Sequence, residues 1–167
     1  PKYYDLKTSD GIPMSDVAVI GEPDHLRSVL NQRCGYQRIG KGCKFCAIES
    51  WWAGYMDKTP AQVAEVAEAA AKEGMIKHVT LSTGTKLSTG KGLEDVVTAA
   101  KLIDRRVSLT KTLNFEPVND IEMLDRLLRV GREAGACTSL CNIECFDENL
   151  REDIMPVKGR NTLDDYK

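Results

Sequence analysis

Two periods of apolar residues alternate along the chain from residue 26 onward. Short segments rich in apolar and β-branched residues predict strands at 26–32, 76–83, 107–115 and 138–146. After each of the first three, apolar residues recur every three or four positions, as on one face of a helix. The alternation predicts four βα units in series, with the fourth helix only begun. Such units form a parallel sheet with right-handed crossovers.

Capping residues mark the expected ends of the helices. The first helix carries a capping-box pattern, with Pro60 at its first position and Gln62 two residues later. Glu122 completes a similar pattern at the third helix. The expected N-terminal caps are Thr59, Asn119 and Asn161, and the expected ends are Gly74 and Gly135.

The number of βα units favours part of a barrel. No Gly-x-Gly-x-x-Gly pattern follows the first strand, so a dinucleotide-binding fold has little support. A complete (β/α)₈ barrel takes about 250 residues, and this chain has 167. We therefore expect an α/β fold, a partial TIM barrel of four βα units that is incomplete at its C-terminal end. Residues 26–167 form this part, and residues 1–25, rich in glycine and proline, are expected to be an irregular lead-in.

Composition narrows the classes of function. The chain is 42% hydrophobic and 29% charged, as in an ordinary globular domain, and its formal net charge is −2. That balance offers no reason to expect nucleic acid or a membrane as a partner. No leader pattern or membrane-length apolar run is present, so a cytoplasmic protein is expected. In a reducing compartment, its six cysteines are more suited to metal binding than to disulfides.

The first three cysteines suggest the chemistry. Cys43 and Cys46 are separated by two residues, which lets both sulfurs reach one metal centre, and Cys34 precedes them in the same loop. Structural zinc sites and electron-transfer clusters usually have four protein ligands. Three thiolates would instead leave one iron of a [4Fe–4S] cluster open to an external ligand. A zinc knuckle or a ferredoxin-like centre on the same cysteines is the alternative.

This loop resembles the cluster-binding loop of the radical SAM superfamily. There, three cysteines follow the first barrel strand, and an aromatic residue, here Phe45, precedes the last. Most members have three residues between the first two cysteines, whereas this chain has eight. The resemblance implies an enzyme in which Cys34, Cys43 and Cys46 hold a [4Fe–4S] cluster whose open iron binds S-adenosylmethionine (SAM).

The resemblance also implies the reaction and its partners. An electron from flavodoxin or ferredoxin would cleave SAM to methionine and a 5′-deoxyadenosyl radical. That radical would abstract hydrogen from a small-molecule substrate of cofactor or metabolite biosynthesis. The non-catalytic metal-binding module stays open as an alternative, as does a scaffold protein that keeps the fold without the chemistry.

The ends of the second and third strands carry further candidates. Ser82, Thr83 and Gly84 resemble the superfamily motif that contacts the SAM amino group, although its usual acidic residue is absent; a simple turn is the alternative. In the third strand, polar residues alternate with apolar ones. Asn114 and Glu116 therefore point to the barrel mouth as candidates for SAM or substrate contact, and a solvated Glu116 is the alternative.

The fourth strand and the residues after it narrow the resemblance to the biotin synthase branch. There, an Asn-x-acid pair, here Asn142 and Glu144, contributes to the SAM and substrate site, and a later arginine, here Arg160, pairs with the SAM carboxylate. If Asn142 and Glu144 face the site, then alternation turns the other cysteines toward the helices, where free cysteine packs as an apolar residue. Those cysteines are Cys137, Cys141 and Cys145.

Aromatic residues after the cysteine loop are weaker candidates. Trp51, Trp52 and Tyr55 could form a wall for adenine or substrate, although core packing is the commoner role. His25 and His78 stand apart from any catalytic pattern.

Overall fold

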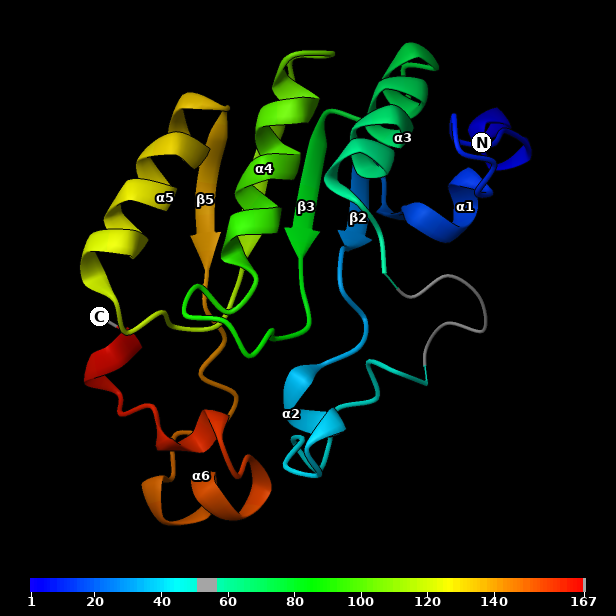
Figure 1. Ribbon diagram of the computed structural model, residues 1–167. Helices are drawn as coiled ribbons and strands as arrows, with labels where there is room; N and C mark the ends of the chain where they lie inside the picture. Colours follow the sequence, from blue (N-terminus) through cyan, green and yellow to red (C-terminus); the bar gives the residue numbers. More distant parts are fainter. Residues whose placement is uncertain (51–56, 167) are drawn as a thin grey trace.

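A five-stranded sheet is the centre of the molecule (Figure 1). The computed structural model describes residues 1–50 and 57–166. Neighbouring strands follow one another in chain order, and β2 to β5 are parallel, whereas β1 runs antiparallel to β2. The strands are β1 (Val19–Glu22), β2 (His25–Val29), β3 (His78–Ser82), β4 (Thr110–Asn114) and β5 (Ala136–Leu140). The sheet alternates with helices, which confirms the predicted α/β fold of a partial (β/α) barrel.

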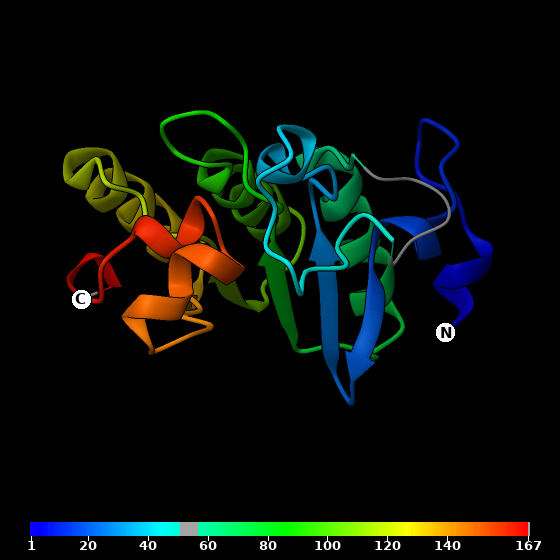
Figure 2. The same ribbon diagram turned by 90° about the horizontal axis from the view of Figure 1, so that it is seen from below.

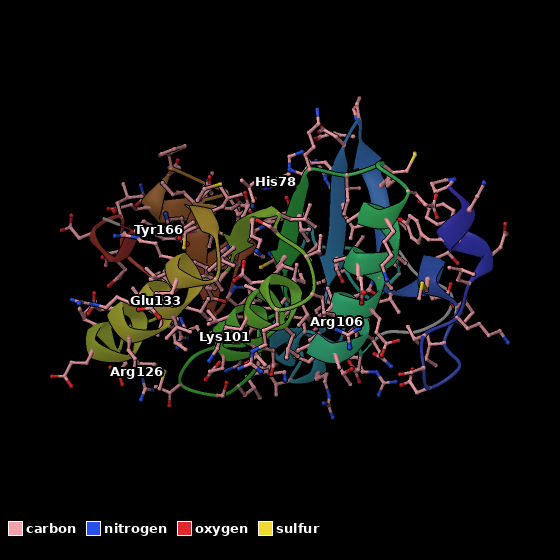
Figure 3. All side chains as sticks on the ribbon, turned by 90° about the horizontal axis from the view of Figure 1, so that it is seen from above. His78, Lys101, Arg106, Arg126, Glu133 and Tyr166 are labelled. Carbon is pink, nitrogen blue, oxygen red and sulfur yellow. The ribbon has the colours of Figure 1, made fainter. Side chains whose placement is uncertain are left out.

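Three helices cover one face of the sheet, as the view from above makes clear (Figure 3). They are α3 (Pro60–Lys72), α4 (Leu93–Asp104) and α5 (Ile121–Glu133). Their apolar stripes and the outward-facing strand residues form the core, which explains why the helical periodicity located them correctly. Among the fully buried residues are Leu26, Val63, Val66, Leu81, Leu93 and Ile103.

The helix caps agree with the sequence in one case and differ in another. Thr59 and Gln62 form the predicted capping box at the start of α3. The cap of α5 is Asp120, whose carboxylate accepts a hydrogen bond from the Met123 N–H at 2.9 Å, so the expected cap at Asn119 is wrong. A carboxylate is the better cap because it also interacts favourably with the positive end of the helix dipole.

The first 25 residues, expected to be irregular, contain regular structure. They include a 3₁₀ helix, η1 (Lys2–Asp5), a short helix, α1 (Met14–Val17), and the edge strand β1. Tyr3 is fully buried, and its hydroxyl donates a hydrogen bond to the Ala18 carbonyl at 3.3 Å. Buried apolar surface thus orders a segment whose glycines and prolines suggested a loop.

The last strand is shorter than predicted. β5 ends at Leu140, and the chain then follows an irregular path to α6 (Glu148–Ile154), η2 (Lys158–Arg160) and η3 (Asp164–Tyr166). Glu144 has a φ of 67°, in the left-handed region, which a β-strand does not accommodate. The predicted strand over 138–146 is therefore wrong beyond Leu140.

The expected helix cap at Asn161 is also wrong. Asn161 ends η2, and Thr162 begins the next turn by bonding to the Asp165 carboxylate through its N–H, at 2.6 Å, and its hydroxyl, at 2.9 Å. The Asn161 amide instead donates a hydrogen bond to Glu116 at 3.3 Å. A tertiary contact therefore orients the Asn161 side chain toward Glu116.

The loops that follow the parallel strands gather at one edge of the sheet (Figure 1), and Figure 2 views the molecule from this side. Short helix α2 (Gly35–Arg38) follows β2 here, and α6 follows β5. Within 1–50 and 57–166, no helix combines the length and apolar character needed to cross a bilayer.

Candidate active site

The inner face of the sheet, opposite the helices, forms a hollow of about 560 Å³ that combines apolar side chains, such as Val17 and Leu140, with polar ones. Its lining alternates along the strands, as predicted: Thr112 and Asn114 lie in the hollow, whereas Leu113 between them is buried in the core. Neighbouring strands contribute further hydroxyl groups at Thr80, Ser82 and Thr138. Ser82 and Asn114 stand at the carboxyl ends of their strands, where sites of α/β barrels form.

The cysteine loop lies at this same edge. Cys34 directly precedes α2, and Cys43 and Cys46 belong to the turn that follows, where the Cys46 N–H bonds to the Cys43 carbonyl at 3.0 Å. The Gln37 amide donates to the Cys46 carbonyl at 2.9 Å and ties this turn to α2. All three cysteines are partly exposed and free of disulfides.

The same loop is fastened to the C-terminal segment of the chain. The Lys44 N–H donates to the Ile154 carbonyl at 2.8 Å, and its ammonium group lies 2.6 Å from a carboxylate oxygen of Asp153. The backbone contact attaches the loop to α6. The ion pair is largely exposed and adds little by itself.

Burial and surrounding charges act on the Cys43 thiol. Burial raises the pKa of the Cys43 thiol to about 11, the cation of Lys158 opposes this rise, and Cys46 and Cys34 each add to it. An incoming cationic cluster would reverse this balance, because metal binding takes the thiolate form.

Three thiols on one loop are the donor set that a [4Fe–4S] cluster with one open iron takes. Among the residues that the structure describes, no three His, Cys, Asp or Glu side chains are grouped as ligands of one metal ion. A cubane cluster distributes its thiolates over different irons, so its ligands need not converge on one point. Three partly exposed thiols on one loop therefore suit a [4Fe–4S] cluster, with Cys34, Cys43 and Cys46 as the residues that would hold it.

The loop after β3 packs directly against the cysteine loop. The Gly84 N–H donates to the Asn31 carbonyl at 2.6 Å, and the Asn31 side-chain amide donates to the Gly84 carbonyl at 3.1 Å. A Cβ atom on Gly84 would lie 2.7 Å from the Asn31 carbonyl oxygen and 3.4 Å from the Cys34 Cα. Gly84 thus permits a close approach of two backbones that a larger residue would prevent.

The three residues of the predicted SAM motif are placed differently. Ser82 lines the hollow, whereas the Thr83 hydroxyl donates to the Gly84 carbonyl at 2.9 Å. The next carbonyl, that of Thr85, accepts from the Gly35 N–H at 2.7 Å. The motif therefore positions the cysteine loop, and contact of its residues with SAM stays a prediction.

Glu116 is a buried hub rather than a solvated carboxylate. Its side chain is only 5% exposed. One carboxylate oxygen accepts from the Tyr36 hydroxyl at 3.0 Å and pairs with the Lys91 ammonium at 3.1 Å. The other accepts from the Thr85 hydroxyl at 2.7 Å. With the bond from Asn161, the carboxylate joins the cysteine loop, the β3 loop and the C-terminal segment.

Tyr36 was not expected at the site from the sequence. Burial, followed by the charge of Glu116, raises the pKa of its phenol far above the ordinary value, so the hydroxyl remains a hydrogen-bond donor. Its position between Cys34 and Cys43 was the available signal, but an aromatic residue in a loop has many uses. Lys91, with a φ of 54°, is likewise identified only by its contacts.

Of the residues that suggested the biotin synthase branch, Asn142 and Glu144 lie on irregular backbone, and Arg160 is the last residue of η2. Asn142 is exposed, and Glu144 pairs with the Lys158 ammonium at 3.3 Å. Arg160 pairs with Glu152 at 3.5 Å, and both side chains are about two-thirds exposed, at 64% and 65%. The strand alternation used to aim Asn142 and Glu144 at the site does not apply, so their contact with SAM stays a prediction.

The second group of cysteines is dispersed. Only Cys141 packs against the hydrophobic core as expected, and burial raises the pKa of its thiol to about 11. Cys137 is exposed, with its sulfur 3.5 Å from the Lys111 carbonyl oxygen, and the sulfur of Cys145 lies 3.5 Å from the Asp147 carbonyl oxygen. Cys137 lies within β5 and opposite to Thr138 in the alternation, but it is exposed, so the expectation that it packs as an apolar residue is wrong. For Cys145 the alternation does not apply, because β5 ends at Leu140.

Three buried cations were also missed. Lys111, on β4, is fully buried and pairs with Asp104 at 3.3 Å. Arg151 is 1% exposed and donates to three carbonyl oxygens in the C-terminal segment. Lys58 is 8% exposed, donates to the Gln32 side chain and borders the hollow; burial lowers its pKa to about 8. Charged residues are rarely buried, so sequence patterns assign them to the surface.

The aromatic candidates have separate outcomes. Phe45 is 55% exposed beside Cys46. Trp51, Trp52 and Tyr55 lie outside the described residues.

A half barrel with three free cysteines at the carboxyl edge of its strands defines a candidate cluster-binding domain. The profile of the radical SAM superfamily matches residues 34–165, which include every strand from β3 to β5 and all three loop cysteines. The chain belongs to the radical SAM superfamily. This places it in a class of enzymes that typically bind a [4Fe–4S] cluster and cleave SAM. No curated protein matches the chain.

Proposed function

We propose that this chain binds a [4Fe–4S] cluster through Cys34, Cys43 and Cys46 and uses it to cleave SAM for radical chemistry on a small molecule. The observation that carries the proposal is a set of three free thiols, partly open to solvent, on one loop at the carboxyl edge of the sheet. When bound, the cluster supplies the electron that splits SAM into methionine and a 5′-deoxyadenosyl radical.

The residues around the thiols hold the loop and shape the site. Glu116 and Gly84 fix the cysteine loop against the β3 loop through the contacts described above. The hollow beside it, which is lined by both apolar and polar residues, offers hydroxyl and amide groups, including Ser82 and Asn114, to the polar parts of SAM and substrate. Phe45, exposed next to Cys46, is suited to contact the bound nucleoside.

We further propose a relation to the biotin synthase branch, with Asn142, Glu144 and Arg160 orienting SAM. The sequence pattern supports this, and the physical cost is small. Arg160 would exchange an exposed partner, Glu152, for the SAM carboxylate, and exposed pairs contribute about 1 kcal/mol or less. Arginine offers a planar pair of donors that fits a carboxylate. The substrate would belong to cofactor or metabolite biosynthesis in the cytoplasm.

Anaerobic reconstitution with iron and sulfide tests the proposal. We expect about four irons per chain, an EPR signal of the reduced protein that changes on addition of SAM, and 5′-deoxyadenosine after reduction. Serine in place of Cys34, Cys43 or Cys46 should abolish all three results. Cys137→Ser is the matched control, because Cys137 is an exposed free cysteine elsewhere in the fold.

Two outcomes would contradict the proposal. Tight binding of one zinc per chain, with no effect of SAM, would favour a non-catalytic metal-binding module. A cluster that assembles fully in Cys34→Ser would show that the eight-residue spacing was assigned wrongly.

A further inference from the structure

Lys58 carries a buried positive charge at the carboxyl edge of the sheet. The residue is 8% exposed, yet it borders both the hollow of about 560 Å³ and a second cavity of about 650 Å³. Its ammonium group donates a hydrogen bond to the side chain of Gln32, which lines the hollow. This bond holds the ammonium group at the wall of the hollow.

The backbone at Lys58 is fixed on both sides. The Lys58 N–H donates to the carbonyl of Leu30, the residue after β2, at 2.7 Å, and Asn31 and Asp57 form an antiparallel bridge. Thr59, the next residue, caps α3. A side chain on so constrained a backbone is suited to position a ligand, because little backbone freedom is lost on binding.

Neighbouring carboxylates offset only part of the cost of burying this charge. Burial lowers the pKa of the Lys58 amine to about 8, and the negative charges of Asp16 and Asp57 oppose this effect without cancelling it. The Asp57 carboxylate also pairs with Arg33, at 3.5 Å. A buried charge is costly unless opposite charge accompanies it, so an anion in the hollow would stabilise the ammonium form.

The floor of the hollow presents hydroxyl and apolar groups in rows across the sheet. Three threonines lie in register on neighbouring strands, Thr80, Thr112 and Thr138. Val29 and Leu140, the last residues of β2 and β5, add apolar surface nearer the carboxyl edge. This lining suits a small organic molecule whose charged end meets Lys58 and whose body carries apolar and hydroxyl groups.

We infer that Lys58 binds a carboxylate of the substrate, so that the substrate is a small carboxylic acid. The inference deepens the proposed function and rests on it, because that function makes the hollow a substrate site. Gln32, which holds the ammonium group, lies two residues before Cys34. Lys58 would therefore anchor one end of the acid near the cysteine loop and leave the rest in the hollow. No bond is made or broken at Lys58.

A second cation, Arg27, also lines the hollow but is less suited to this role. It pairs with Glu22, and the two side chains are about half exposed, at 52% and 51%. Its charge is therefore already balanced by a carboxylate and by water, and an exposed pair of this kind gains little from a further anion. Lys58 has the larger gain because its charge is buried.

The first experiment titrates the apo-protein with hexanoate and with its neutral amide, hexanamide, and follows binding by NMR. We expect hexanoate to bind at least about tenfold more tightly, because only the acid gains a charged hydrogen bond. Lys58→Met should reduce the affinity for hexanoate to that for hexanamide, and an unchanged affinity for hexanamide shows that the hollow is intact. The matched control Lys101→Met removes an exposed lysine of α4 in the helix layer (Figure 3) and should bind both compounds normally.

The second experiment needs no variant. The unmodified chain is labelled with acetic anhydride at pH 8, and mass spectrometry follows the acetylation of single lysines. Hexanoate should slow the acetylation of Lys58 by about threefold or more, because a bound anion keeps the amine protonated. Lys101 is the internal reference, and its acetylation should not change. Hexanamide at the same concentration should slow neither lysine, because it binds too weakly.

Each contrary result has a distinct meaning. The inference is overturned if hexanoate has no advantage over hexanamide or leaves the acetylation of Lys58 unchanged. It is also overturned if Arg27→Gln loses the preference for hexanoate and Lys58→Met keeps it. If SAM displaces hexanoate from the reconstituted protein, then Lys58 serves the SAM carboxylate, and the inference again fails. If hexanoate binding depends on Lys58 but the reconstituted chain forms no 5′-deoxyadenosine, then the proposed function fails while the carboxylate site stands.

Discussion

Replacement of Glu116 by alanine tests whether this carboxylate holds the cysteine loop in place. The change leaves four donors without their acceptor, and two of them, the Tyr36 hydroxyl and the Asn161 amide, are buried. Lys91 is only 17% exposed and would lose its charged partner. Removing one member of a buried ion pair costs about 3–5 kcal/mol.

The lower end of this range is expected, because the Lys91 ammonium can turn toward water. For a chain of this length, about 3 kcal/mol corresponds to a fall in Tm of roughly 6–12 °C. Glu116→Gln keeps the size and one acceptor oxygen but loses the charge and turns an NH₂ group toward the donors of the other oxygen, so it should cost about 1–3 kcal/mol. Calorimetry of the apo-protein gives the Tm, and hydrogen exchange at the Gly35 N–H reports on the loop.

Glu133→Ala is the matched control, since Glu133 is an exposed glutamate near the end of α5 (Figure 3). Its effect should stay within about 0.5 kcal/mol. The reasoning is refuted if Glu116→Ala melts together with this control. It is also refuted if Glu116→Ala is strongly destabilised but the Gly35 N–H retains its protection, because the cysteine loop would then not depend on the carboxylate.

Three further predictions concern pH, close packing and a buried cation. Burial and the neighbouring His25 lower the pKa of His78 from 6.5. The unfolded chain therefore binds the proton more readily, and the free energy of unfolding should fall as the pH drops below about 6.5. Urea unfolding of His78→Gln should show a shallower fall. Gly84→Ala should lower the free energy of unfolding by about 1–3 kcal/mol, because its Cβ would lie 2.7 Å from the Asn31 carbonyl oxygen. An unchanged midpoint in urea would contradict this contact. Arg151→Met should lower the free energy of unfolding by about 3 kcal/mol or more, since buried carbonyls lose their donor, and a neutral result would show that water replaces it.

Local patterns in the sequence were sufficient for the βα framework. The capping box at Thr59, the end of α3 near Gly74 and the apolar stripe of α4 all depend on residues within a few positions of one another. Alternation along β4 correctly separated Thr112 and Asn114 from Leu113, because side-chain direction in a strand repeats every two residues. Spacing also brought attention to the cysteine loop that the family profile includes.

The sequence could not reveal where regular structure stops and tertiary contact begins. β5 ends at Leu140 although the polar and apolar alternation continues, because the chain there turns toward the cysteine loop and Glu144 adopts a left-handed conformation. The Asn161 side-chain amide donates a hydrogen bond to Glu116, and the residue does not cap a helix. In both cases, a distant partner outweighs a local preference.

Glu116 shows this division most clearly. From the sequence it was a carboxylate at a strand end, equally suited to bind a ligand or to meet solvent. The fold places it against Tyr36, which is 80 residues away in the chain, and buries both. A buried carboxylate requires donors, and only the packing of three separate segments determines which donors are within reach.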